Sequence, residues 1–187
     1  VFAELKGSIP ALSDPVVWWK RVEDPRRLVG FALRDALTQL GISVRGDVAL
    51  GKASKQRLLV HHRSNALSSL LHPMGKKSNN FYAEMIFKRL GKPAGGGAAS
   101  FKQAATWIDK LVAREGLVAP GLRMTNGSGL FDANRISAAS MTRLLVRAYR
   151  DPRVRPDLLS QLAIGGVDGT LRRRFTAFRK ARSIRAK

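Results

Sequence analysis

The apolar residues of this chain recur every three or four positions in several segments, which is the period of an amphipathic helix. We therefore expect helices over residues 26–41, 81–90, 101–116 and 137–149, with a shorter one early in residues 155–171. Strand-like patterns are few and short. The pattern as a whole predicts a helix-rich α+β protein.

Several helix ends carry local signals. Asp24 precedes Pro25, which is the arrangement of an N-cap residue followed by a proline in the first turn. Ser100 and Gln103 form a capping-box pattern ahead of the next apolar stripe. Gly116 is a plausible stop for that helix. Asp24 and Ser100 thus predict where two of the helices begin, and Gly116 predicts where the second of them ends.

Other segments have weaker patterns. Residues 16–19 (VVWW) are strand-like, and residues 42–51 resemble a short strand pair around a central turn. A helix over residues 64–75 should be interrupted at Pro73, because proline lacks the backbone N–H that a helix needs. The glycine-rich residues 91–99 are interpreted as a connector.

The apolar faces of the helices define the expected core. Residues 81–90 are apolar around most of the helix circumference, so we expect this helix to be well buried. The spacing also places the following side chains inside, the last three on a C-terminal helix: Trp107, Met141, Leu144, Leu145, Leu171, Phe175 and Phe178.

The composition fits a single folded domain. A chain of 187 residues can bury a core, and a hydrophobic fraction of 44% excludes general disorder. The absence of cysteine excludes disulfides, zinc–thiolate sites and thiol nucleophiles. No apolar run approaches the roughly 18 residues of a membrane span. The sequence shows neither an initiator Met nor a signal-peptide pattern, so we expect that it begins inside a longer protein.

The chain is strongly basic, with 34 Lys and Arg residues against 13 Asp and Glu residues. Residues 171–187 contain eight basic residues and no acidic one. Such a surface attracts polyanions, with nucleic acid as the first candidate and anionic cell-envelope polymers or acidic lipid headgroups after it. A basic excess that serves only solubility is an equally good explanation.

Two kinds of site find little support. The aromatic residues follow core spacing and do not alternate with the basic cluster as stacking platforms for nucleic acid would. His61, His62 and His72 have no carboxylate cluster at ligand spacing, so we expect surface roles and no metal site.

A polar cluster, Ser78-Asn79-Asn80, stands directly before the apolar pattern of residues 81–90. Ser and Asn are common N-cap residues, so helix capping alone can explain this cluster. The segment TNGSGL at residues 125–130 likewise predicts a tight turn, and it does not match the G-x-S-x-G nucleophile elbow. Each motif by itself is weak evidence of function.

Taken in order, four segments resemble one known family. They are HPMGKKSNNFYAEMIFKRLG (72–91), TNGSGL (125–130), GGVDGTLRRRF (165–175) and IRAK (184–187). They are similar to the Ser-x-Asn motif, the DGSGLS-like loop, the GxDGTL-like turn and the start of the Lys-Thr-Gly strand of the serine D-alanyl-D-alanine carboxypeptidases/endopeptidases (peptidase S13), the class C low-molecular-mass penicillin-binding proteins. The resemblance covers about residues 20–187 and implies an incomplete serine β-lactamase/penicillin-binding-protein transpeptidase-like fold.

The chain departs from the family pattern in two ways. The family nucleophile lies in a Ser-x-x-Lys motif, and no serine here has a lysine three residues later. The sequence also stops at Lys187, where the family continues with Thr-Gly. We therefore expect an internal fragment, with residues 1–20 as the tail of an inserted domain and residues 21–187 as a partial penicillin-binding domain. The alternative is a non-catalytic relic that binds the cell wall.

The resemblance implies acyl transfer through a serine acyl-enzyme, which water then hydrolyses. It assigns catalytic roles to Ser78, Asn80 and Lys187. Ser78 would relay a proton to the leaving amine, Asn80 would hold the substrate backbone, and Lys187 would attract the terminal carboxylate of the substrate. Ser128 would join Asn80 and Lys187 in binding substrate, whereas Asp168 is interpreted as a turn residue.

The same resemblance implies the partners and location of the intact protein. It would act on peptidoglycan peptide stems that end in D-Ala-D-Ala, in the periplasm or elsewhere outside the cytoplasmic membrane, with β-lactams as inhibitors. It would need no cofactor or metal, and we expect no nucleic-acid partner and no transmembrane segment. The charge leaves one further function open, that of a basic nucleic-acid-binding module.

Overall fold

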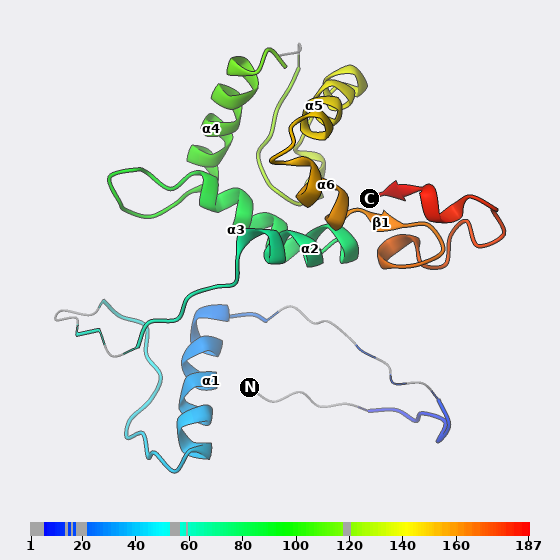
Figure 1. Ribbon diagram of the computed structural model, residues 1–187. Coiled ribbons are helices and arrows are strands. Elements are labelled where there is room, and N and C mark those ends of the chain that lie inside the picture. The colour runs from blue at the N-terminus through cyan, green and yellow to red at the C-terminus, as the bar shows by residue number, and fades with distance from the viewer. Residues whose placement is uncertain are drawn as a thin grey trace. The chain divides into compact units, whose positions relative to one another are not determined.

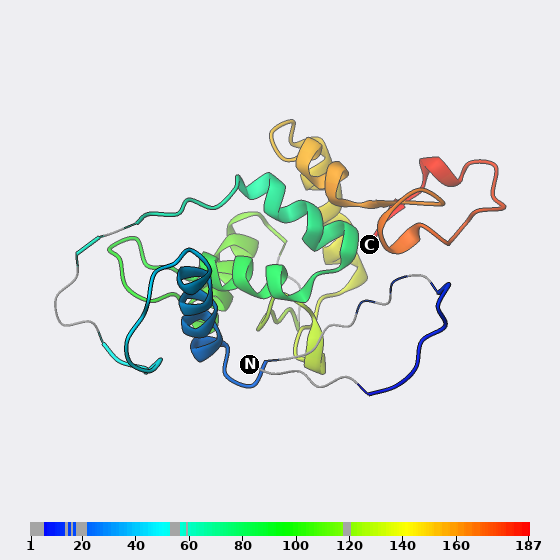
Figure 2. The same ribbon diagram turned by 90° about the horizontal axis from the view of Figure 1, so that it is seen from below.

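The computed structural model of this chain describes residues 6–13, 15, 17, 22–52, 57–58, 60–117 and 121–187. The chain divides into two compact units, residues 1–61 and 62–187, which are described separately (Figures 1 and 2). Of the strand-like residues 16–19, only Val17 lies within the described part, and it is not in a strand.

The first unit is built on helix α1 (Pro25–Gln39), as the sequence predicts. The carboxylate of Asp24 accepts hydrogen bonds from the backbone N–H groups of Arg26 (3.1 Å) and Arg27 (3.2 Å), which confirms the N-cap. Val29, on the apolar stripe of the helix, is 69% exposed. The described residues of this unit therefore leave much of that stripe uncovered.

The predicted strand pair over residues 42–51 is wrong. The segment returns along α1, and its residues form no strand in the described structure. The Arg34 guanidinium donates a hydrogen bond to the carbonyl of Gly46 (3.2 Å), and a Cβ on Gly30 would lie only 2.4 Å from the side chain of Val48. Contacts with α1 therefore position residues 42–51, in place of the strand-to-strand hydrogen bonds that the sequence predicted.

The second unit is mostly helical, and no helix in the described residues is both long and apolar enough to cross a lipid bilayer. In chain order its elements are α2 (Leu67–Lys77), α3 (Asn80–Leu90), α4 (Phe101–Arg114), η1 (Leu130–Asp132), α5 (Ala138–Arg150), α6 (Arg155–Gln161), β1 (Ala163–Ile164), η2 (Gly169–Leu171), η3 (Ala181–Ser183) and β2 (Arg185–Ala186). These bounds confirm the helices that the apolar pattern predicts in residues 64–162.

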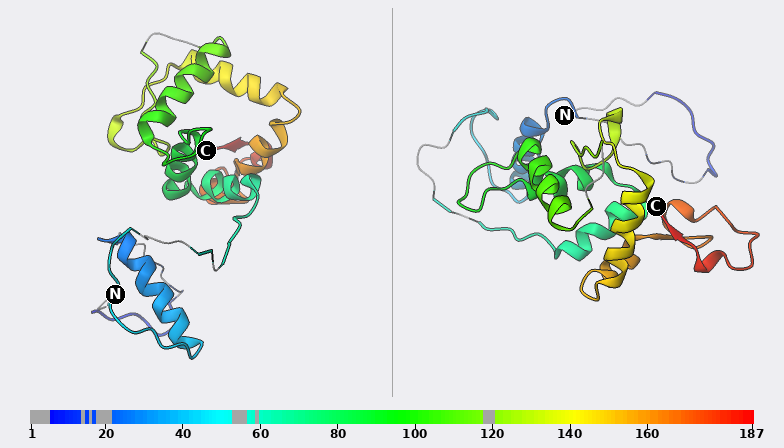
Figure 3. Two further views of the ribbon diagram at one scale, coloured as in Figure 1. Left: turned by 90° about the vertical axis from the view of Figure 1, so that its left-hand side faces the viewer. Right: turned by 90° about the horizontal axis from the view of Figure 1, so that it is seen from above.

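Helix α2 lies at the centre of this unit. It packs against α3, α6, the η2 turn and strand β1. Helix α3 also packs against α4, and α5 packs mainly against α6, so α4 and α5 extend away from the α2–α3 pair (Figure 3). Helix α2 therefore connects the helical part of the unit to its C-terminal strands.

The strands are short and antiparallel. Ala163 pairs with Ala186, and Ile164 pairs with Arg185. Because each strand has two residues, side-chain packing holds this region together more than the ladder does. The combination of helices with this small sheet confirms the helix-rich α+β class.

Two helix starts in this unit are fixed by serine caps. The hydroxyl of Ser100 accepts a hydrogen bond from the backbone N–H of Gln103 at 3.2 Å, which confirms the predicted start of α4. Gly116, with φ of +65°, follows the end of that helix. Ser137 caps α5 in the same manner, accepting from the N–H of Ser140 at 3.1 Å.

The expected break at Pro73 is wrong, because α2 continues through this residue to Lys77. Proline removes one backbone donor, but packing holds the following turn in place. Gly75 approaches α6 so closely that a Cβ on it would lie 2.4 Å from the carbonyl oxygen of Gln161. Contact with α6 therefore outweighs the tendency of proline to end a helix.

The predicted C-terminal helix is also wrong. Leu171 is buried, but Phe175 and Phe178 are 42% and 56% exposed. Phe175 has φ of +63°, in the left-handed region, and this conformation interrupts a right-handed helix. Residues 172–180 form mainly turns and bends instead, and the short 3-10 helix η3 follows them.

The core consists mainly of small side chains. Its buried apolar residues are Ala83, Phe87, Ala104, Leu117, Ala163, Leu171 and Ala181. The following residues, expected inside, are more than a third exposed: Phe81, Trp107, Met141, Leu144 and Leu145. The predicted burial of α3 is therefore confirmed only for Ala83 and Phe87, and the predicted burial of Met141, Leu144 and Leu145 on α5 is wrong.

Two constraints meet at Gly169, in the turn that contacts α2. Its φ is +56°, and a Cβ on it would lie 2.4 Å from the carbonyl oxygen of Lys76. A side chain there would strain the backbone and push the η2 turn away from α2.

We expect Gly169→Ala to lower the free energy of unfolding by about 2 kcal/mol, because the left-handed conformation alone costs an L-residue roughly 1–2 kcal/mol. The matched control is Gly95→Ala, in the connector, where a Cβ meets no atom within 4 Å. Urea unfolding followed by circular dichroism measures both variants. Equal stability of the two would contradict the close contact between η2 and α2.

Candidate functional site

Ser78 occupies the junction between α2 and α3. It is the C-cap of α2, with φ of 52° and ψ of 46°, in the left-handed region. The next residue, Asn79, caps α3 by accepting a hydrogen bond from the N–H of Tyr82 at 3.2 Å. Capping of α3 therefore explains Asn79 but not Ser78 or Asn80.

The Ser78 backbone is held in a conformation that is costly for a residue with a Cβ. Its side chain is exposed, and in the described part of the chain its hydroxyl makes no hydrogen bond. Asn80, the first residue of α3, is exposed as well. Strained residues of this kind persist only where the surroundings fix them, and they concentrate at functional sites.

An ion pair fixes the end of α2 just before Ser78. The ammonium of Lys76 lies 2.7 Å from a carboxylate oxygen of Asp168, and Lys76 is only 7% exposed. The other carboxylate oxygen of Asp168 accepts a hydrogen bond from the N–H of Ile164 at 2.8 Å. One carboxylate thus ties α2 to strand β1.

These contacts determine the ionisation of Asp168. The hydrogen bond from Lys76, and after it the one from the N–H of Ile164, hold the pKa of Asp168 below its ordinary value, although partial burial acts in the opposite direction. Both oxygens of the carboxylate are therefore engaged in holding the turn. This geometry agrees with the interpretation of Asp168 as a turn residue.

Lys187 follows strand β2 directly, and β2 pairs with β1 next to Asp168. Its side chain is exposed. Contacts from α2 through the η2 turn and β1 to β2 thus connect the segment that carries Ser78 to the segment that carries Lys187. No hydrogen bond or ion pair among the described residues joins Ser78, Asn80 and Lys187 directly, so their shared role stays a prediction.

A second carboxylate, that of Glu84 on α3, holds the TNGSGL loop. It accepts hydrogen bonds from the N–H groups of Gly127 (3.2 Å) and Ser128 (3.1 Å), and from the Ser128 hydroxyl. Because the Ser128 hydroxyl donates to Glu84, it lies against α3 and is not free to donate elsewhere. Gly127 sits against the helix backbone, where a Cβ would lie 2.2 Å from the carbonyl oxygen of Ala83.

The loop that carries Ser128 is closed at its base. Arg123 and Arg135 exchange backbone hydrogen bonds of 2.8 and 2.7 Å. Inside it, the side-chain oxygen of Asn134 accepts from the N–H of Thr125 at 2.8 Å, and that of Asn126 accepts from the N–H of Gly129 at 2.8 Å. These side chains give the loop a definite shape around the short 3-10 helix η1.

The contribution of histidine to this arrangement is limited to His72, whose nearby charge is the last of the causes that lower the pKa of Asp168. His61, His62 and His72 are exposed. In the part of the chain that the structure describes, no cluster of three or more His, Asp or Glu side chains could hold a metal ion.

Comparison with known proteins gives the family. The profile of the D-Ala-D-Ala carboxypeptidase 3 (S13) family matches residues 3–187. The chain belongs to this family. The resemblance of the four ordered segments is thereby confirmed.

Members of the S13 family share substantial identity with the chain. It is 33% identical over 150 residues to a D-alanyl-D-alanine carboxypeptidase from an Actinomadura species. The aligned region covers 78% of this chain and 28% of that protein. The chain is 30% identical over 169 residues to the D-alanyl-D-alanine carboxypeptidase DacB from Haemophilus influenzae, covering 90% of this chain and 35% of that protein. The chain thus spans about a third of the length of these relatives.

Solved structures of S13 enzymes match the fold. Penicillin binding protein 4 (dacB) from Haemophilus influenzae matches with a TM-score of 0.69 and 28% identity, covering 78% of this chain and 32% of that one. Its complex with a β-lactam matches with a TM-score of 0.66 and 27% identity, covering 77% and 33%. The match confirms that this chain holds part of a penicillin-binding-protein transpeptidase-like fold.

Sequence reasoning missed the two charged anchors of this S13 segment, Lys76 and Glu84. Each had a visible signal. Glu84 is the one charged residue among the apolar residues 81–87, and Lys76 precedes Ser78 by two positions. A charge on an otherwise apolar helix face suggests a buried partner, but the partners Asp168 and Ser128 lie far away in the sequence.

We expect Asp168→Asn to lower the free energy of unfolding by about 1–2 kcal/mol at neutral pH, a modest value because the Asp168 side chain is 38% exposed. Since the pKa of Asp168 is lowered in the folded state, the contribution of the pair is complete above the ordinary carboxyl pKa of about 4 and is lost as the pH falls through the folded value. The difference in unfolding free energy between Asp168→Asn and the original chain should therefore become smaller in acid.

The measurement is urea unfolding at several pH values between about 3 and 7. Asp109→Asn, on the exposed face of α4, is the matched control and should change stability little. If the difference in unfolding free energy between Asp168→Asn and the original chain stayed constant across this pH range, the ion pair would be contradicted.

Glu84→Gln should loosen the TNGSGL loop, because one amide oxygen cannot accept all three hydrogen bonds and the amide N–H₂ would face donors. We expect amide hydrogen exchange at Gly127 and Ser128 to accelerate by about tenfold or more, since lost hydrogen bonds of this kind are worth about 1–3 kcal/mol. Exchange in α5 serves as the internal control. Unchanged protection of Gly127 would refute the anchor.

Proposed function

We propose that this chain supplies part of the active site of a serine D-Ala-D-Ala carboxypeptidase or endopeptidase that acts on peptidoglycan. The observation that carries the proposal is Ser78, which stands at a strained junction of two helices in a chain of the S13 family. Its hydroxyl makes no hydrogen bond to any residue that the structure describes. A residue that only linked two helices would be more stable as glycine in this conformation.

The proposed reaction is acyl transfer. A serine oxygen attacks the carbonyl of the D-Ala-D-Ala amide, the C–N bond breaks, and the amine leaves with a proton. Ser78 delivers that proton, because a hydroxyl donates and accepts at the same time. Water then hydrolyses the acyl-serine ester and frees the enzyme.

The remaining residues bind the substrate. Asn80 holds the peptide backbone through its amide, and Lys187 attracts the terminal carboxylate. Ser128 contributes through the loop that Glu84 positions, and its own hydroxyl already donates to that carboxylate. We assign it to shaping the substrate site and not to proton transfer.

The acylated serine lies outside these 187 residues in this proposal. No serine of the chain stands in a Ser-x-x-Lys motif, and the chain spans about a third of the length of its relatives. Catalytic groups of this kind act as a unit, so the chain alone should be inactive. Residues 1–20 are then the tail of an inserted domain, and residues 21–187 are a partial penicillin-binding domain.

The substrates and location follow from the same proposal. The intact protein works outside the cytoplasmic membrane on peptide stems that end in D-Ala-D-Ala, without a cofactor. β-Lactams inhibit it by acylating the same serine. A Haemophilus influenzae relative of known structure is complexed with a β-lactam, which supports this expectation.

Fluorescent penicillin tests the proposal. The 187-residue chain should not become covalently labelled, whereas a longer protein that includes a Ser-x-x-Lys segment should be. Labelling of the isolated chain would show that it contains the acylated serine. Absence of labelling in the longer protein would favour a non-catalytic relic that binds the wall.

In that longer protein, we expect Ser78→Ala to slow acylation by about 10²–10⁴-fold, the usual contribution of a positioned proton-transfer group. Ser78→Gly should be equally slow, although it relieves the strain of the left-handed backbone. Ser68→Ala, on the exposed side of α2, should acylate at the original rate. Normal acylation by Ser78→Gly would remove the hydroxyl from the mechanism.

A further inference from the structure

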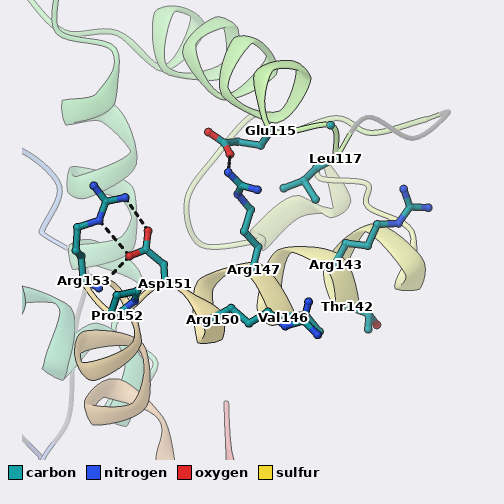
Figure 4. A pocket seen from close by; sticks show the side chains of 11 residues that line it. Glu115, Leu117, Thr142, Arg143, Val146, Arg147, Arg150, Asp151, Pro152 and Arg153 are labelled. Carbon is teal, nitrogen blue, oxygen red and sulfur yellow. Dashed lines mark hydrogen bonds and ion pairs between the residues drawn. The ribbon is translucent and has the colours of Figure 1, made fainter.

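A hollow of about 680 Å³ lies between the end of α4 and helix α5 (Figure 4). Its lining includes four arginines and two carboxylates: Arg143, Arg147, Arg150, Arg153, Glu115 and Asp151. We call this hollow the arginine groove. It belongs to the second unit alone and shares no residue with the peptidase site proposed above.

Both carboxylates of the arginine groove are already paired. Arg147 reaches from α5 to Glu115, which is also 3.1 Å from the guanidinium of Arg114. Arg153 binds Asp151 through side-chain contacts of 3.1 and 2.9 Å. The hydrogen bonds from Arg153, helped by the nearby Arg147, lower the pKa of Asp151 to about 2, so it stays ionised and paired at neutral pH.

The other two arginines of the groove, Arg143 and Arg150, are not paired in the part of the chain that the structure describes. Within the described residues, the guanidinium groups of Arg143 and Arg150 make no hydrogen bond or ion pair (Figure 4). They stand seven positions apart, at two turns on one face of α5, with Arg147 between them. The pairs at Glu115 and Asp151 leave these two positive charges uncompensated in a concave surface.

The spacing indicates the kind of ligand. Seven residues correspond to about 10 Å along a helix, which is more than one small anion spans. A chain with repeated negative charges can engage both groups, and the planar guanidinium fork suits phosphate oxygens. A flat lipid surface cannot enter a groove between two helices, whereas a flexible chain can.

The residues that line the arginine groove also indicate which kind of phosphate-bearing polymer it fits. The remaining residues of the groove are Gly116, Leu117, Thr142, Val146 and Pro152, so it holds no aromatic side chain. Single-stranded nucleic acids owe much of their affinity to stacking of bases on such side chains. A phosphodiester chain without aromatic bases requires no stacking platform.

We propose that the arginine groove binds a flexible phosphodiester polymer that lacks aromatic bases, such as a polyol phosphate, through Arg143 and Arg150. Binding involves no covalent step. It is independent of the acyl-transfer function, so it can hold or fail whatever the outcome of penicillin labelling.

The test is a fluorescence-anisotropy titration of the full chain with a labelled glycerol-phosphate oligomer. We expect the double variant Arg143→Gln/Arg150→Gln to bind about tenfold more weakly. The dependence of the binding constant on salt should also become shallower, by about one to two in logarithmic slope between about 50 and 200 mM. Among the described residues neither arginine makes a hydrogen bond or ion pair, so circular dichroism should be unchanged.

The matched control is Arg172→Gln/Arg173→Gln, which removes the same charge from exposed residues outside the arginine groove. It should weaken binding by less than about twofold. An equal loss in both double variants would overturn the proposal in favour of general surface charge. Equal or tighter binding of single-stranded DNA, of anionic vesicles or of polyglutamate at the same salt concentration would also overturn it.

Discussion

The ion pair between Lys76 and Asp168 is the constraint on which the arrangement of the second unit depends. It joins residues 92 positions apart, and one partner is almost completely buried. An ammonium in that environment needs its carboxylate, because an unpaired buried charge is strongly destabilising. The pair therefore makes the position of the C-terminal strands a condition for the stability of α2, and with it the position of Ser78.

The carboxylate of Glu84 has a similar structural role on helix α3. Glu84 satisfies two backbone donors and one hydroxyl of a loop whose regular structure is limited to the short 3-10 helix η1. Together the two ion-pair and hydrogen-bond anchors attach two motif segments, 125–130 and 165–175, to the helices of a third, 72–91. These family motifs are therefore also a set of tertiary contacts.

Predictions of helix starts from the sequence succeeded where they depended on residues close together in the chain. The caps at Asp24 and Ser100 depend on side chains within three residues, and both are confirmed. One failed prediction depended on a distant contact, because α6 keeps α2 intact past Pro73. The C-terminal helix fails for a local reason, the left-handed backbone of Phe175, which the apolar spacing did not indicate. For the site, the sequence indicated Ser78 through the family resemblance, but the partners of Lys76 and Glu84 depend on folding and could not be inferred from spacing.

The left-handed backbone of Ser78 has one more consequence. Ser78 and Asn79 are the two residues between α2 and α3, so the φ and ψ angles of Ser78 help to set both the direction of its side chain and the angle between the helices. A change in the Ser78 backbone alters both at once. The direction of this side chain is therefore coupled to the packing of α2 against α3.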